Sequence, residues 1–147
     1  MAILSNRAAA KRDNGADAAL LILRLVLGFL ILAHGISKLP PPPPDYLTGM
    51  LAKANLPAAL AWGVYVGEIL APILLIIGVW TRLAAVVIII NMVFAVLLAH
   101  TGDLFSIDKN TGGYALELQA MYVFTAVALA VAGAGRFSLG GRYGPLN

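Results

Sequence analysis

The chain has 147 residues, of which 61% are hydrophobic and only 12% are charged. A soluble domain of this length rarely carries so large an apolar fraction, because its interior is too small to hide it. The absence of cysteine excludes thiol redox chemistry by the chain itself, a disulfide framework and a thiolate metal site. The formal net charge of +3 gives no case for a nucleic-acid partner, so the composition favours a protein of the lipid bilayer.

Four apolar runs follow a polar N-terminal segment. The runs are approximately Ala16–Leu39, Leu56–Trp80, Leu83–His100 and Tyr114–Ala134. Each approaches or exceeds the ~20 residues that a helix needs to cross a bilayer. The strands of a β-barrel would alternate apolar and polar residues, whereas these runs are apolar on every side. We therefore predict an all-α membrane protein, a bundle of four transmembrane helices.

Positive charges in the short loops predict the orientation of these helices. The positive residues before the first run, between the second and third, and after the fourth are Arg7, Lys11, Arg12, Arg82, Arg136 and Arg142. In the opposite loops, lysines are accompanied by aspartates, so both termini are expected in the cytoplasm. The chain then divides into a polar cytoplasmic tail (1–15), a membrane domain (16–137) and a C-terminal cytoplasmic tail (138–147).

Five consecutive prolines, Pro40–Pro44, follow the first run. Proline cannot continue a helix, because it lacks the backbone N–H. We expect this segment to stop the first helix and to leave it in an extended polyproline form. Such a segment would hold the first outer loop away from the membrane surface.

Ionisable residues within the apolar runs are the main candidates for a functional site, because a charge at membrane depth needs a partner or a purpose. On the first helix, the residues that share one face, about 120° wide, include Arg24, Gly28, His34, Gly35 and Lys38. We predict that this face points into the bundle and that the opposite face contacts lipid. The glycines would let a neighbouring helix, or a flat ligand, approach the backbone closely.

On the second helix, Glu68 is followed four residues later by Pro72. The Glu68 carbonyl therefore loses its helical partner, and position 68 offers both a carboxylate and a free carbonyl near the middle of the bilayer. Arg24 is expected at a similar depth, which leaves two interpretations open. The two residues could form a structural ion pair that locks the first helix onto the second. Alternatively, Glu68 binds a proton or a headgroup, and Arg24 tunes that binding.

A second polar group is expected nearer the outer face. Its members are His34, Lys38, His100, Glu117 and Gln119. Two histidines and a carboxylate could hold a metal, but the spacing of a metal motif is missing, so we predict a hydrogen-bonded polar cap and no metal. A proton relay through histidine and glutamate is the intermediate interpretation. Asn91 in the third helix is expected to make an interhelical hydrogen bond rather than to belong to a site.

Four stretches resemble the successive motifs of DoxX-type membrane proteins. They are RLVLGFLILAHGISKL from Arg24, VGEILAPILLIIGVWTRLAA from Val66, GGYALELQAMY from Gly112 and AGAGRFSLG from Ala132. The resemblance covers nearly the whole chain from the first helix to just past the fourth. It implies a four-helix protein of the cytoplasmic (inner) membrane of a prokaryote. The motif positions it carries over are Arg24, Gly28, His34, Gly35, Lys38, Glu68, Arg82, His100, Glu117, Gly135 and Arg136.

The resemblance also implies a link to redox chemistry, because the family is named after a subunit associated with thiosulfate:quinone oxidoreductase, and other relatives are linked to thiol stress or quinone handling. We expect a lipid quinone between the helices. Hydrogen bonds and proton transfer are assigned to Arg24, His34, Glu68 and Glu117, and the remaining binding contacts to Gly28, Gly35, Lys38 and His100. Electrons would come from a partner or from a small reductant such as thiosulfate, and whether the chain is itself an enzyme stays open.

Two alternatives belong to other functional classes. The chain could be a non-catalytic scaffold that docks a soluble redox enzyme, or a small transporter with Glu68 as its proton site. Its small size favours a homo-oligomer or a redox partner protein. A scaffold predicts that polar substitutions change stability and association but no turnover, whereas a transporter predicts pH-driven uptake that is lost in the Glu68→Gln variant.

Overall fold

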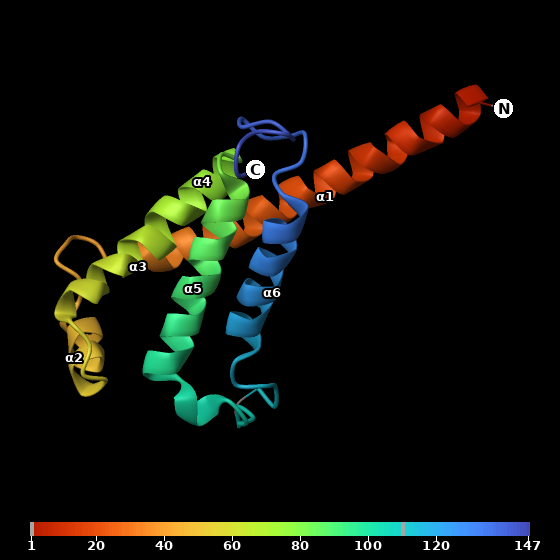
Figure 1. Ribbon diagram of the computed structural model, residues 1–147. Helices are drawn as coiled ribbons and strands as arrows, with labels where there is room; N and C mark the ends of the chain where they lie inside the picture. The colour runs from red at the N-terminus through yellow and green to blue at the C-terminus, as the bar shows by residue number, and fades with distance from the viewer. Residues whose placement is uncertain (1, 110) are drawn as a thin grey trace.

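The computed structural model describes residues 2–109 and 111–147, and the side chains from Asn14 onward within these ranges. The described chain is helical and contains no strand, which confirms the predicted all-α class; an isolated β-bridge joins Ile107 to Tyr114. The helices are α1 (Ala2–Ile36), α2 (Asp45–Lys53), the 3-10 helix η1 (Ala58–Trp62), α3 (Gly63–Tyr65), the π-helix η2 (Val66–Leu70), α4 (Ala71–Ile77), α5 (Thr81–Ala99), the 3-10 helix η3 (Thr101–Asp103) and α6 (Glu117–Ala132) (Figure 1).

Three helical segments of the described chain are long and apolar enough to cross a membrane. They are Asn14–Ile36, Ala58–Ile77 and Thr81–Ala99. The apolar helix α6 has 16 residues, which at 1.5 Å per residue is about 24 Å and shorter than the ~30 Å hydrocarbon core. All four predicted apolar runs are therefore helical, and three of them have the length of a span.

The second span is continuous but irregular, since η1, α3, η2 and α4 follow one another without a break. Pro72 lies in the first turn of α4, where a missing N–H is tolerated. Immediately before it, the chain widens into the π-helix η2, with Glu68 at its centre. Short π-helical segments within α-helices often mark functional sites, because they re-aim side chains.

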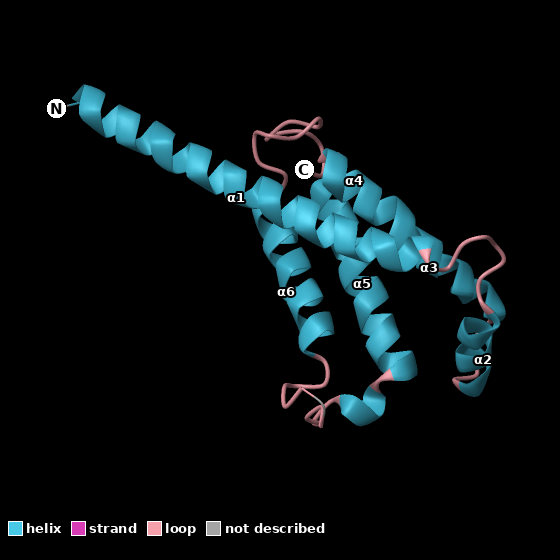
Figure 2. Ribbon diagram, turned by 180° about the vertical axis from the view of Figure 1, so that it is seen from behind, coloured by secondary structure: helices cyan, strands magenta, loops and turns pink. Residues whose placement is uncertain are grey.

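The helices pack around one apolar core. Helix α1 lies along η2 and α4, and α5 packs between α4 and α6 (Figures 1 and 2). The core residues are Leu27, Ile31, Ala71, Leu75, Ala84, Ala85, Ile88, Met92, Tyr122, Ala126 and Leu129. On the opposite face of α1, Ile22, Val26 and Phe29 are exposed, as expected of a surface that meets lipid. Arg24, Gly28 and Gly35 are buried toward the bundle, as predicted, but His34 is exposed.

Two segments differ from the sequence-based expectation. The N-terminal polar segment, expected as a tail, continues α1 from Ala2 and projects beyond the bundle (Figure 1). Residues 40–42 form a bend rather than an extended polyproline segment, and the chain then returns through α2. Because Leu47, Met50 and Leu51 share one face of α2, this helix packs onto η1 and α5 instead of standing away from the membrane domain.

Candidate functional site

An ion pair joins the first span to the second. The Lys38 ammonium contacts the Glu68 carboxylate, and the two side chains are 16% and 7% exposed. Lys38 lies two residues beyond the end of α1, and its backbone carbonyl accepts a hydrogen bond of 3.1 Å from the Tyr65 hydroxyl. The exit of α1 is therefore held against the second span through both a side chain and the backbone, at Glu68 of η2 and at Tyr65 of α3.

Asn91 of α5 completes this polar group. Its side-chain N–H donates to the second oxygen of the Glu68 carboxylate at 3.3 Å. The approach depends on Gly67, since a Cβ there would lie 2.5 Å from the Asn91 side chain. The predicted interhelical hydrogen bond of Asn91 is confirmed, but its partner is Glu68, so Asn91 joins the candidate site, a role that the sequence analysis disfavoured. An isolated amide within an otherwise apolar run was the signal available.

The two glycines on the polar face of α1 serve close helix packing. A Cβ on Gly28 would lie 2.5 Å from the Ile76 side chain, and one on Gly35 would lie 2.3 Å from the Glu68 carbonyl oxygen. The carbonyl that Pro72 frees therefore faces the Gly35 backbone, where a weak Cα–H···O contact is available to it. The sequence predicted that these glycines admit either a neighbouring helix or a flat ligand, and the structure shows the neighbouring helix.

A cavity of about 790 Å³ opens beside the ion pair. This is the range of small-molecule sites, which combine apolar walls with a few polar groups. The polar residues that line it are Lys38, Tyr46, Glu68, Asn91 and His100. Apolar side chains of α2, of the second span and of the C-terminal half of α5 line the rest. The cavity thus offers charged and neutral hydrogen-bonding groups within an apolar space.

Tyr46 brings a phenol from α2 to this cavity. Burial raises the pKa of the Tyr46 hydroxyl, and the nearby negative charge of Glu68 raises it further. Both effects disfavour the tyrosinate. At neutral pH this hydroxyl is therefore protonated and can donate a hydrogen bond to a bound molecule.

Arg24 does not meet Glu68, so the predicted contact between them is wrong. Its guanidinium donates to the carbonyls of Ala134 at 2.9 Å and Phe137 at 2.7 Å, and the residue is only 1% exposed. It also lies against Gly78, which ends α4. The C-terminal ends of α4 and α6 carry partial negative charge, which stabilises a buried cation. An ion pair does join the first span to the second, but its positive charge comes from Lys38 and not from Arg24.

Residues 133–147, here named the C-terminal cap, fold back over this end of the bundle (Figure 1). Buried Asp17 accepts the backbone N–H of Arg136 at 3.1 Å and pairs with Arg142 at 3.4 Å. The Asn147 side chain accepts the N–H of Thr81 at 2.9 Å. The segment expected as a C-terminal tail is therefore bound to the starts of the first and third spans. Sequence analysis missed Asp17 and Asn147, because both bind backbone groups that are distant in the chain.

The remaining predicted site residues do not form one outer polar cap. His34 is exposed and its ring packs edge-on against Tyr122, with the centroids 6.2 Å apart. Glu117 is exposed at the start of α6. His100 lines the cavity, and its Nδ1 lies 3.1 Å from the Asp103 carboxylate. Among the described side chains, no three His, Cys, Asp or Glu residues are placed to hold a metal ion.

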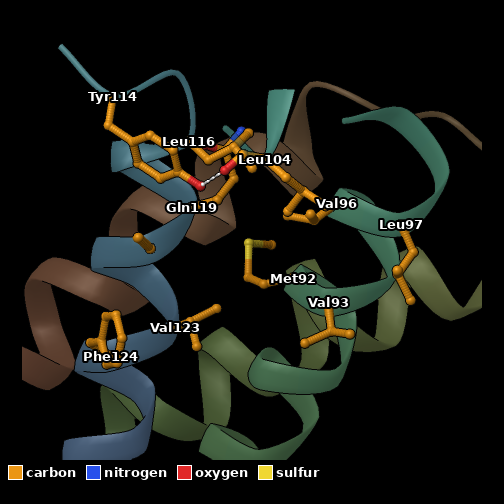
Figure 3. A pocket seen from close by; sticks show the side chains of 11 residues that line it. Met92, Val93, Val96, Leu97, Leu104, Tyr114, Leu116, Gln119, Val123 and Phe124 are labelled. Atoms are coloured by element: carbon orange, nitrogen blue, oxygen red, sulfur yellow. Dashed lines mark hydrogen bonds between the residues drawn. The ribbon is translucent and has the colours of Figure 1, made fainter. Parts of the chain in front are cut away.

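A smaller cavity of about 240 Å³ lies between α5 and α6. Met92 and Val123 approach it from the two helices, and Gln119 lies at its rim (Figure 3). The Tyr114 hydroxyl is engaged, because it donates to the Leu104 carbonyl at 2.8 Å. The residues that line this cavity include no charged group, so the larger cavity is the better candidate site.

Comparison with known proteins supports one family. The DoxX family matches residues 19–101, a range that contains Lys38, Glu68 and Asn91. A protein of Haemophilus influenzae, described as an uncharacterized protein, is 32% identical over 127 residues, which cover 84% of this chain and 90% of that protein. No solved structure gives a significant match.

Proposed function

The chain belongs to the DoxX family and is a multi-pass membrane protein, and on this premise we propose that it binds a lipid quinone in the cavity beside Lys38 and Glu68. The bound molecule would place its headgroup at the ion pair and its tail along the apolar wall. The protein then acts as a quinone-linked component of a redox system, with electrons supplied by a partner protein or a small reductant such as thiosulfate.

We further propose four spans, with both termini in the cytoplasm of a prokaryote. Helix α6 is the fourth span, and the polar loops at its two ends allow a short helix to be accommodated by local thinning of the bilayer. The positive residues before the first span, at the start of α5 and after α6 support this orientation.

The observation that carries the quinone proposal is the gathering of hydrogen-bond donors at one wall of an apolar cavity. A quinone presents carbonyl oxygens, which accept hydrogen bonds. The Lys38 ammonium, the second N–H of the Asn91 amide and the Tyr46 hydroxyl can donate them. The ring and the lipid tail suit the apolar remainder of the cavity.

Glu68 is the residue to which we assign proton exchange. Its carboxylate lies at the cavity wall between Lys38 and Asn91 and can hold or release a proton there. A bound quinone would supply two-electron redox chemistry, which needs protons where water is scarce. Lys38 and Asn91 hold the carboxylate in place at the cavity wall.

The test is a lipid extract of the purified protein in mild detergent, assayed for quinone by absorbance and mass. We expect stoichiometric quinone in the wild type and in the matched Glu117→Gln variant, whose exposed carboxylate is not among the groups that line the cavity. A folded Glu68→Gln variant should lose it. Wild-type protein without quinone would overturn the proposal and favour a scaffold, or a transporter if pH-driven uptake is found.

A further inference from the structure

We infer that the Lys38–Glu68 site exchanges ligand and protons with one side of the membrane only, the side opposite the C-terminal cap. Three layers of the bundle carry this inference: an open cavity, a dry apolar layer, and the cap. This one-sided access does not depend on which molecule the cavity binds.

The open layer lies at the end of the bundle away from both termini (Figure 1). The cavity is lined by α2, by the exit of α1 and by α5 from Val87 to its C-terminal end. Tyr46 is about half exposed, and His100 is partly exposed just after the end of α5. Polar groups therefore lead from Glu68 toward this end, where water and protons are available.

The next layer separates Glu68 from the capped end. Each span contributes fully buried apolar side chains between the level of the site and the level of Arg24: Leu27, Ile31, Leu75, Ala85 and Ile88, with Leu129 of α6. Close packing leaves no path for water through such a layer, and an ion or a proton without polar partners is costly there. The ionisable pair His34 and Tyr122 does not bridge it, because both residues lie toward the open end of their helices.

The C-terminal cap closes the other end. Arg24 binds the cap through the carbonyls of Ala134 and Phe137, and Asp17 binds it through Arg136 and Arg142. Asn147 ties it to Gly78 and Thr81, where the second and third spans meet. These contacts connect the cap to α1, to the end of α4 and to the start of α5. A transport cycle would have to break the cap and part the apolar layer, so the site is a one-sided binding site rather than a passage.

The chain has no cysteine, so an introduced thiol is the only one that a thiol reagent can label. The cavity is probed by the Ala95→Cys variant. The open end is marked by the Phe105→Cys variant and the cap by the Leu139→Cys variant, because both native side chains are strongly exposed. Right-side-out and inverted vesicles are treated with a membrane-impermeant maleimide, and the label is counted on the purified protein.

We expect the Ala95→Cys variant to be labelled in the same vesicles as the Phe105→Cys variant and not in those that label the Leu139→Cys variant. The Ile88→Cys variant, within the apolar layer, should be labelled in neither. The Val64→Cys variant probes the same cavity from α3 if the Ala95→Cys variant fails to fold. Labelling of either cavity variant from the cap side, or from neither side, would overturn the inference. Because no quinone is needed, the outcome is independent of the extraction assay.

Discussion

Lys38 and Glu68 form an ion pair between a residue just outside the first span and a residue at the middle of the second. The long lysine side chain reaches inward along the cavity wall, so its charge is placed deeper than its backbone. Glu68 is carried toward the cavity by the π-helix η2. The carboxylate of Glu68, which lies at membrane depth, is thus paired with Lys38, a residue that the sequence places at the edge of the membrane.

Removal of Lys38 should leave Glu68 as a buried, unpaired acid. We expect the Lys38→Met variant to lose about 3 kcal/mol of stability, the size found when one partner of a buried pair is removed. The double variant Lys38→Met/Glu68→Gln should recover most of this loss. Thermal unfolding in mild detergent, followed by circular dichroism, measures both. Additive effects of the two substitutions would show that the pair is not coupled.

The pKa of the Tyr46 hydroxyl depends on the charge of Glu68. The negative carboxylate adds to burial in raising the pKa of the Tyr46 hydroxyl, so the Glu68→Gln variant should show a lower pKa for this tyrosine than the wild type. The sign is fixed, because a nearby anion disfavours the tyrosinate. Absorbance titration of tyrosinate measures the shift, and the Tyr46→Phe variant assigns it. An unchanged titration would contradict the assigned interaction between the two side chains.

Gly67 and Gly63 provide a matched pair on the second span. A Cβ at Gly67 would collide with the Asn91 side chain, whereas a Cβ at Gly63 would meet nothing within 4 Å. We expect the Gly67→Ala variant to lose about 1–3 kcal/mol and to retain less quinone, because Asn91 is pushed off Glu68. The Gly63→Ala variant should be neutral or slightly stabilised. Equal effects of both substitutions would contradict the assigned packing.

Arg24 is expected to act on stability and not on binding. The Arg24→Gln variant loses two charge-assisted hydrogen bonds to the C-terminal cap, and we expect a loss of about 3 kcal/mol. Quinone retained per folded protein should match the wild type. The reverse pattern, unchanged unfolding with lost quinone, would return Arg24 to the binding site that the sequence suggested.

Several features of the fold follow from local sequence. The apolar runs predict the helices because only a helix satisfies its own backbone within lipid. Pro72 predicts a disturbed helix at Glu68, and the π-helix lies there. Helix α2 was missed because the prolines before it suggested an extended segment, although Leu47, Met50 and Leu51 have helical spacing.

The partners of the buried charges could not be predicted from the sequence. The sequence analysis placed Arg24 and Glu68 at similar depths, but in the structure Glu68 lies level with Gly35 and Arg24 lies level with Gly78. The apolar runs do not fix how far one helix is shifted along its neighbour. The sequence by itself determined the all-α class, three helices of spanning length and the buried charges at Arg24 and Glu68, since insertion energy depends on composition along one helix. Only the tertiary structure decided that Lys38 and Asn91 serve Glu68 while Arg24 holds the cap, because that choice rests on contacts between helices and with a folded-back segment far away in the chain.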